Sequence, residues 1–239
     1  MAAAAASRGE AVSAVDVCAA SLAPVEVTGA GLTAAVRAGS GHLMCATDEL
    51  SERLAELQLT LGEGPTPDAA AAAGPVLSSD LAGADVEIRW LSFAPAARQV
   101  GASAIFAFPL HIGAIRVGVL EMYRREPGPL SADQLGDALV FADTAAVLLL
   151  ESKDWARGAA GPVAGASGQP PYLALHRAEI DQATGMLTEQ LGVGIEEAFV
   201  RLRAYAYAGD RRLTEVARDI VARRLRLGRD PDVPVDDPR

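Results

Sequence analysis

The stretch that decides the fold of this chain is ALHRAEIDQATGMLTEQLGVGIEEAFVRLRAYAYAGDRRLTEVA, residues 174–217. Apolar residues recur along it at spacings of three and four, which places them on one face of a 3.6-residue helix. The pattern is interrupted at residues 192–194 and again at 209–210, both of which contain glycine. It therefore predicts three consecutive helices within residues 173–227, and the arginines near their end suggest an output module that binds nucleic acid.

Each predicted helix carries a single apolar stripe. The stripe of the second helix comprises Ile195, Ala198, Phe199, Leu202 and Ala206, and that of the third comprises Leu213, Val216, Ala217, Ile220 and Val221. In the first helix, Leu173, Ile180 and Leu187 recur every seven residues. This heptad spacing is compatible with pairing of first helices across a dimer and equally with packing inside one chain. Because so short a bundle buries little surface, we expect a partner subunit to help stabilise it.

Charge divides the chain into an acidic first part and a mildly basic second part. The net charge of the whole chain is −10, and residues 1–172 hold 10 basic and 19 acidic groups. Residues 173–227 hold 9 basic and 8 acidic groups, and residues 210–226 hold six arginines against three carboxylates. A local surplus of this kind favours a polyanionic partner, although arginines on a surface helix also serve solubility alone.

The alternation of elements in the first two thirds predicts an α+β fold. Residues 28–37 and 41–46 form a predicted hairpin, residues 76–78 a short strand, and residues 104–112 and 115–124 two longer strands. Helices are predicted at residues 11–22, 48–61, 69–73 and 131–152. We expect an antiparallel sheet with helices packed against it.

Composition marks the boundaries and the compartment. Residues 1–9 are Ala-rich and predicted to be disordered, and residues 158–171 have the Gly, Ala, Pro and Ser content of a flexible linker. Two cysteines are too few for a disulfide scaffold, so a reducing cytoplasm is expected, and Cys45 is interpreted as a packed, inert thiol. No secretory signal or membrane-spanning stretch is recognised, which predicts a cytoplasmic protein without membrane association.

Residues 174–217 resemble the ANTAR domain, the three-helix RNA-binding module of bacterial antitermination regulators. The resemblance rests on three motifs: Ile180-x-x-Ala183-x-Gly185-x-Leu187, Glu197-Ala198-Phe199-x-x-Leu202-Arg203-x-Tyr205-Ala206, and Arg211-Arg212-Leu213-x-x-Val216-Ala217. Two positions depart from the family, which often has lysine where this chain has Thr184 and a basic residue where it has Gln190. Loss of two cations should weaken RNA binding unless other arginines compensate.

The first two thirds resemble a GAF domain of the kind fused to ANTAR modules in actinobacterial regulators. The strings that carry the resemblance are Ala46-Thr47-Asp48-Glu49-Leu50, Leu57-Gln58-x-x-Leu61-Gly62-Glu63-Gly64-Pro65, and Phe108-Pro109-Leu110 followed by Gly118-Val119-Leu120. The resemblance implies a sensor domain at residues 10–157, a possible small-molecule ligand, an ANTAR domain at 172–227 and an acidic Pro-rich tail at 228–239. Relatives often have Cys-Leu where this chain has Thr66-Pro67, which argues against a thiol-based signal there.

No catalytic or cofactor-binding pattern stands out. A nucleophile with its base, a metal spacing and a complete phosphate-binding glycine loop are all missing, and His42 and His111 are isolated in the sequence. The chain is therefore predicted not to be an enzyme and to carry no cofactor or metal.

Three functional hypotheses follow. In the first, a homodimer grips RNA stem-loops and prevents terminator formation, with Arg203, Arg211 and Arg212 binding phosphates. Tyr205 would then stack on an unpaired base, although its place near the apolar stripe also suits the bundle core. In the second, the chain is a dimerising interaction or sensor module with weak or no RNA binding. In the third, the last helix reads DNA, for which it is less basic and polar than usual.

Overall fold

The computed structural model describes residues 12–34, 41–72, 74–151 and 171–228. These residues form two compact units, one ending at Leu173 and the other beginning at Ala174. The predicted disordered start, residues 1–9, lies outside the described residues. So do the predicted linker at 158–171 and the predicted tail at 228–239, except for residues 171 and 228.

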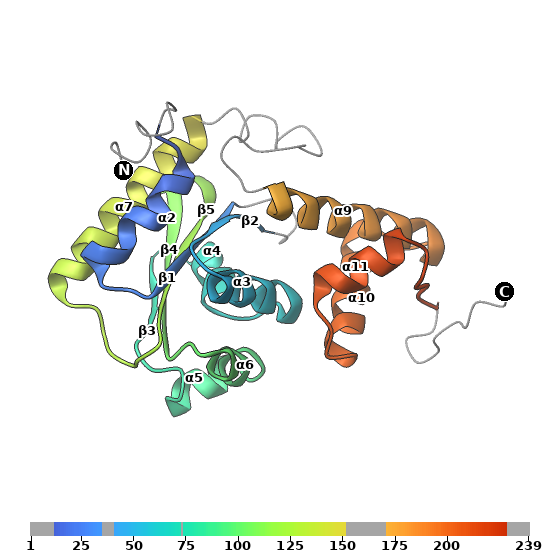
Figure 1. Ribbon diagram of the computed structural model, residues 1–239, viewed down its shortest axis with the longest axis horizontal. Coiled ribbons are helices and arrows are strands. Elements are labelled where there is room, and N and C mark those ends of the chain that lie inside the picture. The colour runs from blue at the N-terminus through green and yellow to red at the C-terminus, as the bar shows by residue number, and fades with distance from the viewer. Residues whose placement is uncertain (1–11, 35–40, 73, 152–170, 229–239) are drawn as a thin grey trace. The chain divides into compact units, whose positions relative to one another are not determined.

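A five-stranded antiparallel sheet forms the centre of the first unit (Figure 1). Its order is β2-β1-β5-β4-β3, with β1 at Gly29–Ala34, β2 at His42–Ala46, β3 at Val76–Ser78, β4 at Ala104–Ile112 and β5 at Ile115–Arg124. The predicted pairing of β1 with β2 is confirmed, and a tight turn joins β4 to β5. Gly113 in that turn has φ 59°, a left-handed conformation that glycine adopts readily.

Helices cover both faces of this sheet (Figure 1). On one face lie α2 (Ala14–Val25) and α7 (Ala132–Glu151); on the other lie α3 (Glu49–Leu61), α4 (Pro65–Ala71) and α6 (Phe93–Val100), with α5 (Ala84–Arg89) before α6. Along β4, Phe106 and Phe108 join the core on the α2–α7 side, whereas Ile105 and Ala107 join the core on the α3–α6 side. The sheet is therefore buried on both faces, and the predicted α+β class is confirmed.

Two short helices were not predicted, because α5 and α6 have only six and eight residues and show no extended periodicity. Tertiary hydrogen bonds position them instead. The carboxylate of Glu63 accepts the backbone N–H groups of Ser92 and Phe93 at 2.6 and 2.7 Å, and Asp68 accepts the indole N–H of Trp90 at 3.0 Å. Glu63 thus holds the start of α6 against the loop before α4.

The residues around Asp48 tie α3 to the sheet. Asp48 Oδ1 accepts the backbone N–H of Ser51 at 2.7 Å and caps α3, while its Oδ2 accepts the Tyr123 hydroxyl of β5 at 2.6 Å. Burial, together with this carboxylate, raises the pKa of Tyr123. Gly29 on β1 lies against the Tyr123 ring, and a Cβ there would also approach Ser51 Oγ within 2.7 Å. Glycine at residue 29 therefore allows β1, β5 and the start of α3 to pack together.

The interpretation of Cys45 as a free packed thiol was wrong. Cys45 on β2 forms a disulfide with Cys18 on α2, across a sequence separation of 27 residues. Both side chains are buried in the core on the α2–α7 side. The number of cysteines and the apolar neighbours of Cys45 do not indicate this bond, because the packing of α2 beside β2 brings the two sulfurs together.

A buried polar cluster occupies the opposite face of the sheet. Glu121 of β5 is only 7% exposed, and its Oε2 accepts both the Gln58 amide and the Thr66 hydroxyl at 2.7 Å. Gln58 in turn accepts the backbone N–H of Thr66 at 2.7 Å. Burial raises the pKa of Glu121, and the two hydrogen bonds lower it by less. The cluster joins α3, α4 and the central strand through one carboxylate.

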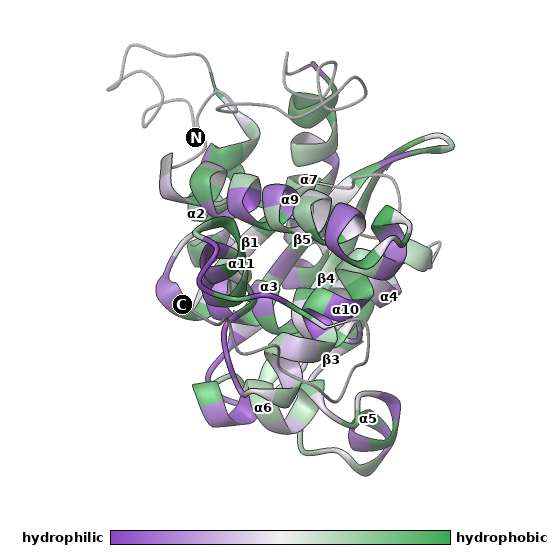
Figure 2. Ribbon diagram, turned by 90° about the vertical axis from the view of Figure 1, so that its right-hand side faces the viewer, coloured by the Kyte–Doolittle hydropathy of each residue, from purple (hydrophilic) through white to green (hydrophobic). Residues whose placement is uncertain are grey.

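The second unit contains the three predicted helices. They are α9 (Pro171–Leu191), α10 (Ile195–Ala208) and α11 (Leu213–Val221). The buried apolar residues that these helices contribute to the second unit are Ala183, Leu187, Leu191, Ala198, Leu202, Ala206, Leu213, Val216, Ala217 and Ile220. Figure 2 shows hydrophilic and hydrophobic residues interleaved along α9, as expected for helices with one buried face. Packing within the chain explains the burial of Leu187, and pairing across a dimer stays a prediction.

None of the helices in the described parts of the chain is long and apolar enough to cross a membrane.

The raised pKa of Glu121 predicts a pH-dependent stability. Because the folded protein retains a proton that the unfolded chain loses above about pH 4.5, stability should fall as pH rises from there to the folded pKa. Glu121→Gln keeps an acceptor for Gln58 and Thr66 and cannot ionise, so its stability relative to wild type should increase between pH 5.5 and 8.5. Urea unfolding at several pH values measures this. Glu126→Gln, which removes an exposed carboxylate, is the control, and a Glu121→Gln trend no larger than the control's contradicts the expectation.

The Cys18–Cys45 disulfide predicts a redox-dependent stability of the first unit. Cross-links closing loops of this size typically contribute about 3 kcal/mol, so a double variant with Cys18→Ala and Cys45→Ala should lose about that much under oxidising conditions. A reducing agent should destabilise the wild type and leave the double variant unchanged. Denaturant unfolding with and without reductant tests this, and full thiol labelling of the unreduced, denatured wild type would show that the bond is absent.

Candidate nucleic-acid interface

The candidate interface lies on α10, α11 and the segments that follow each of them. The loop after α10 folds back on the last turn of that helix, because the Arg211 backbone N–H donates to the Ala206 carbonyl at 2.9 Å and Gly209 donates to the Tyr205 carbonyl at 3.1 Å. Asp210 in this loop has φ 46°, a left-handed conformation. The chain turns sharply here, and Arg212 forms the extended residue immediately before α11.

The four predicted site residues occupy two adjoining segments. Arg203 and Tyr205 lie on α10, and Arg211 and Arg212 lie in the loop that packs back against it. Tyr205 lies close enough to contribute to the electrostatics of Arg211. All four side chains are half-buried. Their role in RNA binding stays a prediction.

Arg203 is a stacked arginine. Its guanidinium carbon lies 5.7 Å from the centre of the Phe199 ring, one turn earlier on α10. Burial lowers the pKa of Arg203 from its ordinary value. Stacking on an aromatic face orients the planar guanidinium, and an oriented guanidinium can make bidentate contacts with a phosphate.

The most exposed aromatic ring of α10 belongs to a residue that sequence reasoning did not select. Tyr207 is 60% exposed, whereas Tyr205 is half-buried. The signal was present in the sequence, because Tyr205 is three residues after Leu202 of the apolar stripe, whereas Tyr207 is four residues after Arg203, on the side of that arginine. Tyr207 therefore presents a larger ring surface to a partner than Tyr205 does.

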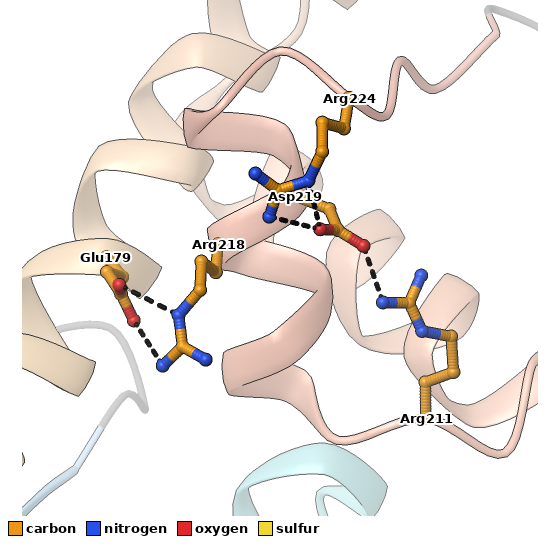
Figure 3. Close-up of polar contacts among 5 residues, drawn as sticks. All are labelled: Glu179, Arg211, Arg218, Asp219 and Arg224. Carbon is orange, nitrogen blue, oxygen red and sulfur yellow. Dashed lines mark hydrogen bonds and ion pairs between the residues drawn. The ribbon is translucent and has the colours of Figure 1, made fainter.

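Asp219 on α11 gathers two arginines from opposite directions (Figure 3). Its Oδ2 accepts Arg211 Nη2 at 2.6 Å, and its Oδ1 accepts Arg224 Nη2 at 2.6 Å. The hydrogen bonds from these arginines hold the pKa of Asp219 below its ordinary value, and the same contact raises the pKa of Arg211. Asp219 carries one negative charge and the two arginines carry two positive charges, so this group of three side chains has a net charge of +1.

Other arginines of the unit are neutralised by single carboxylates. Arg218 on α11 donates from Nε and Nη2 to the two oxygens of Glu179 on α9, at 3.1 and 3.2 Å (Figure 3). Arg201 pairs with Glu197 one turn away on α10, at 2.6 Å. Such exposed pairs contribute about 0–1 kcal/mol to stability. They reduce the positive charge that a polyanion would meet.

The two positions that depart from the ANTAR pattern both have roles inside the unit. Thr184 is buried, and its hydroxyl donates to the Ile180 carbonyl of its own helix at 2.7 Å. The Gln190 amide donates to the Leu227 carbonyl at 2.6 Å, which fastens the segment after α11 to the end of α9. In this chain both side chains make hydrogen bonds within the second unit, and neither carries a positive charge.

Metal-ligating groups do not converge in the described parts of the chain. No group of three or more His, Cys, Asp or Glu side chains there is arranged to hold a metal ion. His42 lies at the start of β2 and His111 near the end of β4, where it is exposed.

Comparisons with known proteins address the two units separately. Residues 174–221 match the ANTAR domain family. The first unit has the fold of the GAF domain from a Coxiella burnetii phosphoenolpyruvate-protein phosphotransferase, with a TM-score of 0.50, 16% identity, and coverage of 62% of this chain and 88% of that chain. The search of curated proteins gives no match.

Two further solved GAF domains are similar at lower scores. One is the Acinetobacter phosphoenolpyruvate-protein phosphotransferase GAF domain, with a TM-score of 0.48, 13% identity, and coverage of 62% of this chain and 89% of that chain. The other is the GAF-B domain of DevS from Mycobacterium smegmatis, with a TM-score of 0.44, 19% identity, and coverage of 60% of this chain and 94% of that chain. The sheet order, the two helical layers and the family match agree: this chain combines a GAF-like fold with an ANTAR domain, a GAF-ANTAR architecture.

Proposed function

We propose that this chain is a signal-responsive regulator that binds RNA stem-loops through its ANTAR domain and acts by transcription antitermination. The observation that carries the proposal is the ANTAR match at residues 174–221, on a unit with a local surplus of arginine over residues 210–226. Phosphate neutralisation by Arg and Lys supplies much of the affinity of such interfaces. The protein would act as a homodimer in the cytoplasm, where transcripts are made, and without catalytic activity.

The input would be a small molecule that acts on the GAF-like unit. The similarity of this unit to a solved GAF domain supports this assignment, and the buried polar cluster of Glu121, Gln58 and Thr66 is where three of its elements are joined. A ligand there would change contacts among α3, α4 and β5 together. Such a change would be the signal passed to the output domain.

A second candidate function is a dimerising interaction module with weak or no RNA binding. Thr184 and Gln190 favour this second function, because they stand at positions where the ANTAR family often carries cations. Here both side chains make hydrogen bonds within the chain instead. The pairing of Arg218 and Arg201 with carboxylates points the same way. The two candidates differ in a single measurable property, salt-sensitive affinity for stem-loop RNA.

The proposed function predicts salt-dependent binding to paired stem-loops. Filter binding of the full chain to an RNA with two adjacent hairpins, at about 50 and 200 mM salt, should show affinity that falls steeply with salt. Duplex DNA should compete less well than unlabelled stem-loop RNA. Binding no stronger than to an unstructured RNA of the same length would favour the interaction module, and equal competition by duplex DNA would favour a DNA reader.

The exposure of the two tyrosines predicts an order of effects. Stacking of a base on an aromatic ring is worth about 1–3 kcal/mol, so Tyr207→Ala should weaken RNA binding by roughly 5- to 150-fold. Tyr207→Phe should retain most of the affinity, and Tyr205→Ala should have the smaller effect on affinity and the larger effect on thermal stability. Tyr172→Ala, at an exposed tyrosine near the start of α9, is the control. Equal affinities for Tyr207→Ala and this control would remove Tyr207 from the interface.

A further inference from the structure

The segment that follows α11 is ordered by contacts with the ANTAR helices. The Arg224 and Leu225 backbone N–H groups donate to the Asp219 carbonyl at 2.8 and 3.2 Å, and Arg223 donates to the Ile220 carbonyl at 2.9 Å. Arg223 has φ 59°, a left-handed conformation that ends the helical path of α11. Residues 222–228, here called the arginine turn, therefore continue the folded unit.

The far end of the arginine turn is fastened to α9. Leu227 is buried at 8% exposure, and its carbonyl accepts the Gln190 amide at 2.6 Å. Because both ends of the turn are fixed, its arginines need less ordering on binding than those of a flexible tail. The segment begins one residue after the end of the ANTAR match.

The arginine turn carries the least neutralised charge of the unit. Arg223 and Arg226 are exposed and have neither an ion pair nor a side-chain hydrogen bond to the described part of the chain. Arg224 shares Asp219 with Arg211 (Figure 3). The three arginines of the turn thus have one carboxylate beside them, Asp219, which also pairs with Arg211. By contrast, Arg218 and Arg201 each have a carboxylate of their own.

The geometry points to a binding site for the RNA phosphate backbone, and we propose that the arginine turn is a second contact element of the ANTAR domain. This inference rests on the proposed RNA-binding function. The turn passes Gln190 and presents cations beside α9, a helix that lacks a cation at residues 184 and 190. Arginines at the end of α11 also lie where the helix dipole favours positive charge, so their clustering costs little.

The test is the salt dependence of stem-loop binding by the full-length double variant Arg223→Gln/Arg226→Gln. Arg224 is left in place, because it holds Asp219. Removal of two phosphate contacts should reduce the slope of log affinity against log salt by roughly 1.4–1.8 and weaken binding at low salt. Each single variant should give about half of the change. The matched control, Arg53→Gln/Arg98→Gln, removes the same charge from ion-paired arginines of the GAF-like unit and should leave the slope unchanged.

A second variant separates charge from position. Gln190→Ala removes the hydrogen bond to Leu227 and keeps every arginine, so affinity should fall while the circular dichroism of the helices is retained. If wild type shows no salt-sensitive binding to stem-loop RNA, the proposed function itself is wrong. If wild type binds and the double variant has the slope of the control, the arginine turn is not a contact element. Equal loss of duplex DNA and stem-loop binding would assign the turn to general polyanion attraction and also overturn the proposal.

Discussion

The carboxylate of Asp48 is the constraint on which the first unit depends. One oxygen caps α3, and the other accepts the Tyr123 hydroxyl from β5, the strand at the centre of the sheet. The two contacts fix a helix and a strand through a single side chain, in a place that only glycine at residue 29 leaves open. A buried hydroxyl without its partner costs about 1–3 kcal/mol, so the arrangement is favoured only when all three residues are present. The polar cluster at Glu121 depends on this placement, because Gln58 belongs to the same helix.

Asp219 has a comparable organising role in the second unit, with a different consequence. It fixes the loop before α11 through Arg211 and the turn after α11 through Arg224. These arginines are paired with a carboxylate inside the unit. The positive charge available to a polyanion is therefore smaller than the number of arginines in the sequence suggests. The positions of the arginines matter more than their number. Arginines with a carboxylate of their own lie on α10 and α11, and the surplus of positive charge lies after the end of α11.

Sequence patterns predicted what depends on local periodicity and missed what depends on contacts between distant residues. The strands at β4 and β5, the long helix α7 and the three ANTAR helices follow from alternation or helical spacing, and all are confirmed. The helices α5 and α6 were missed because Glu63 and Asp68, from another segment, hold them in place. The disulfide and the Gln190–Leu227 hydrogen bond join residues 27 and 37 positions apart, separations that no short motif encodes. At the candidate interface, the arginines were selected from charge and motif, and their role stays a prediction; Tyr207, the more exposed tyrosine, was overlooked although its helical spacing from Arg203 could have indicated it.

The sheet ends in two short strands, with three residues in β3 and five in β2. Edge strands offer unpaired backbone N–H and C=O groups to other chains, and short edges offer few of them. β2 is further restrained by its covalent bond to α2 and by a register shift in its pairing with β1 between Leu32 and Thr33. A long, flat edge that could recruit a strand from a second copy is therefore missing from the described sheet. Self-association through continuous β-structure is disfavoured, which protects a half-hydrophobic chain from aggregation.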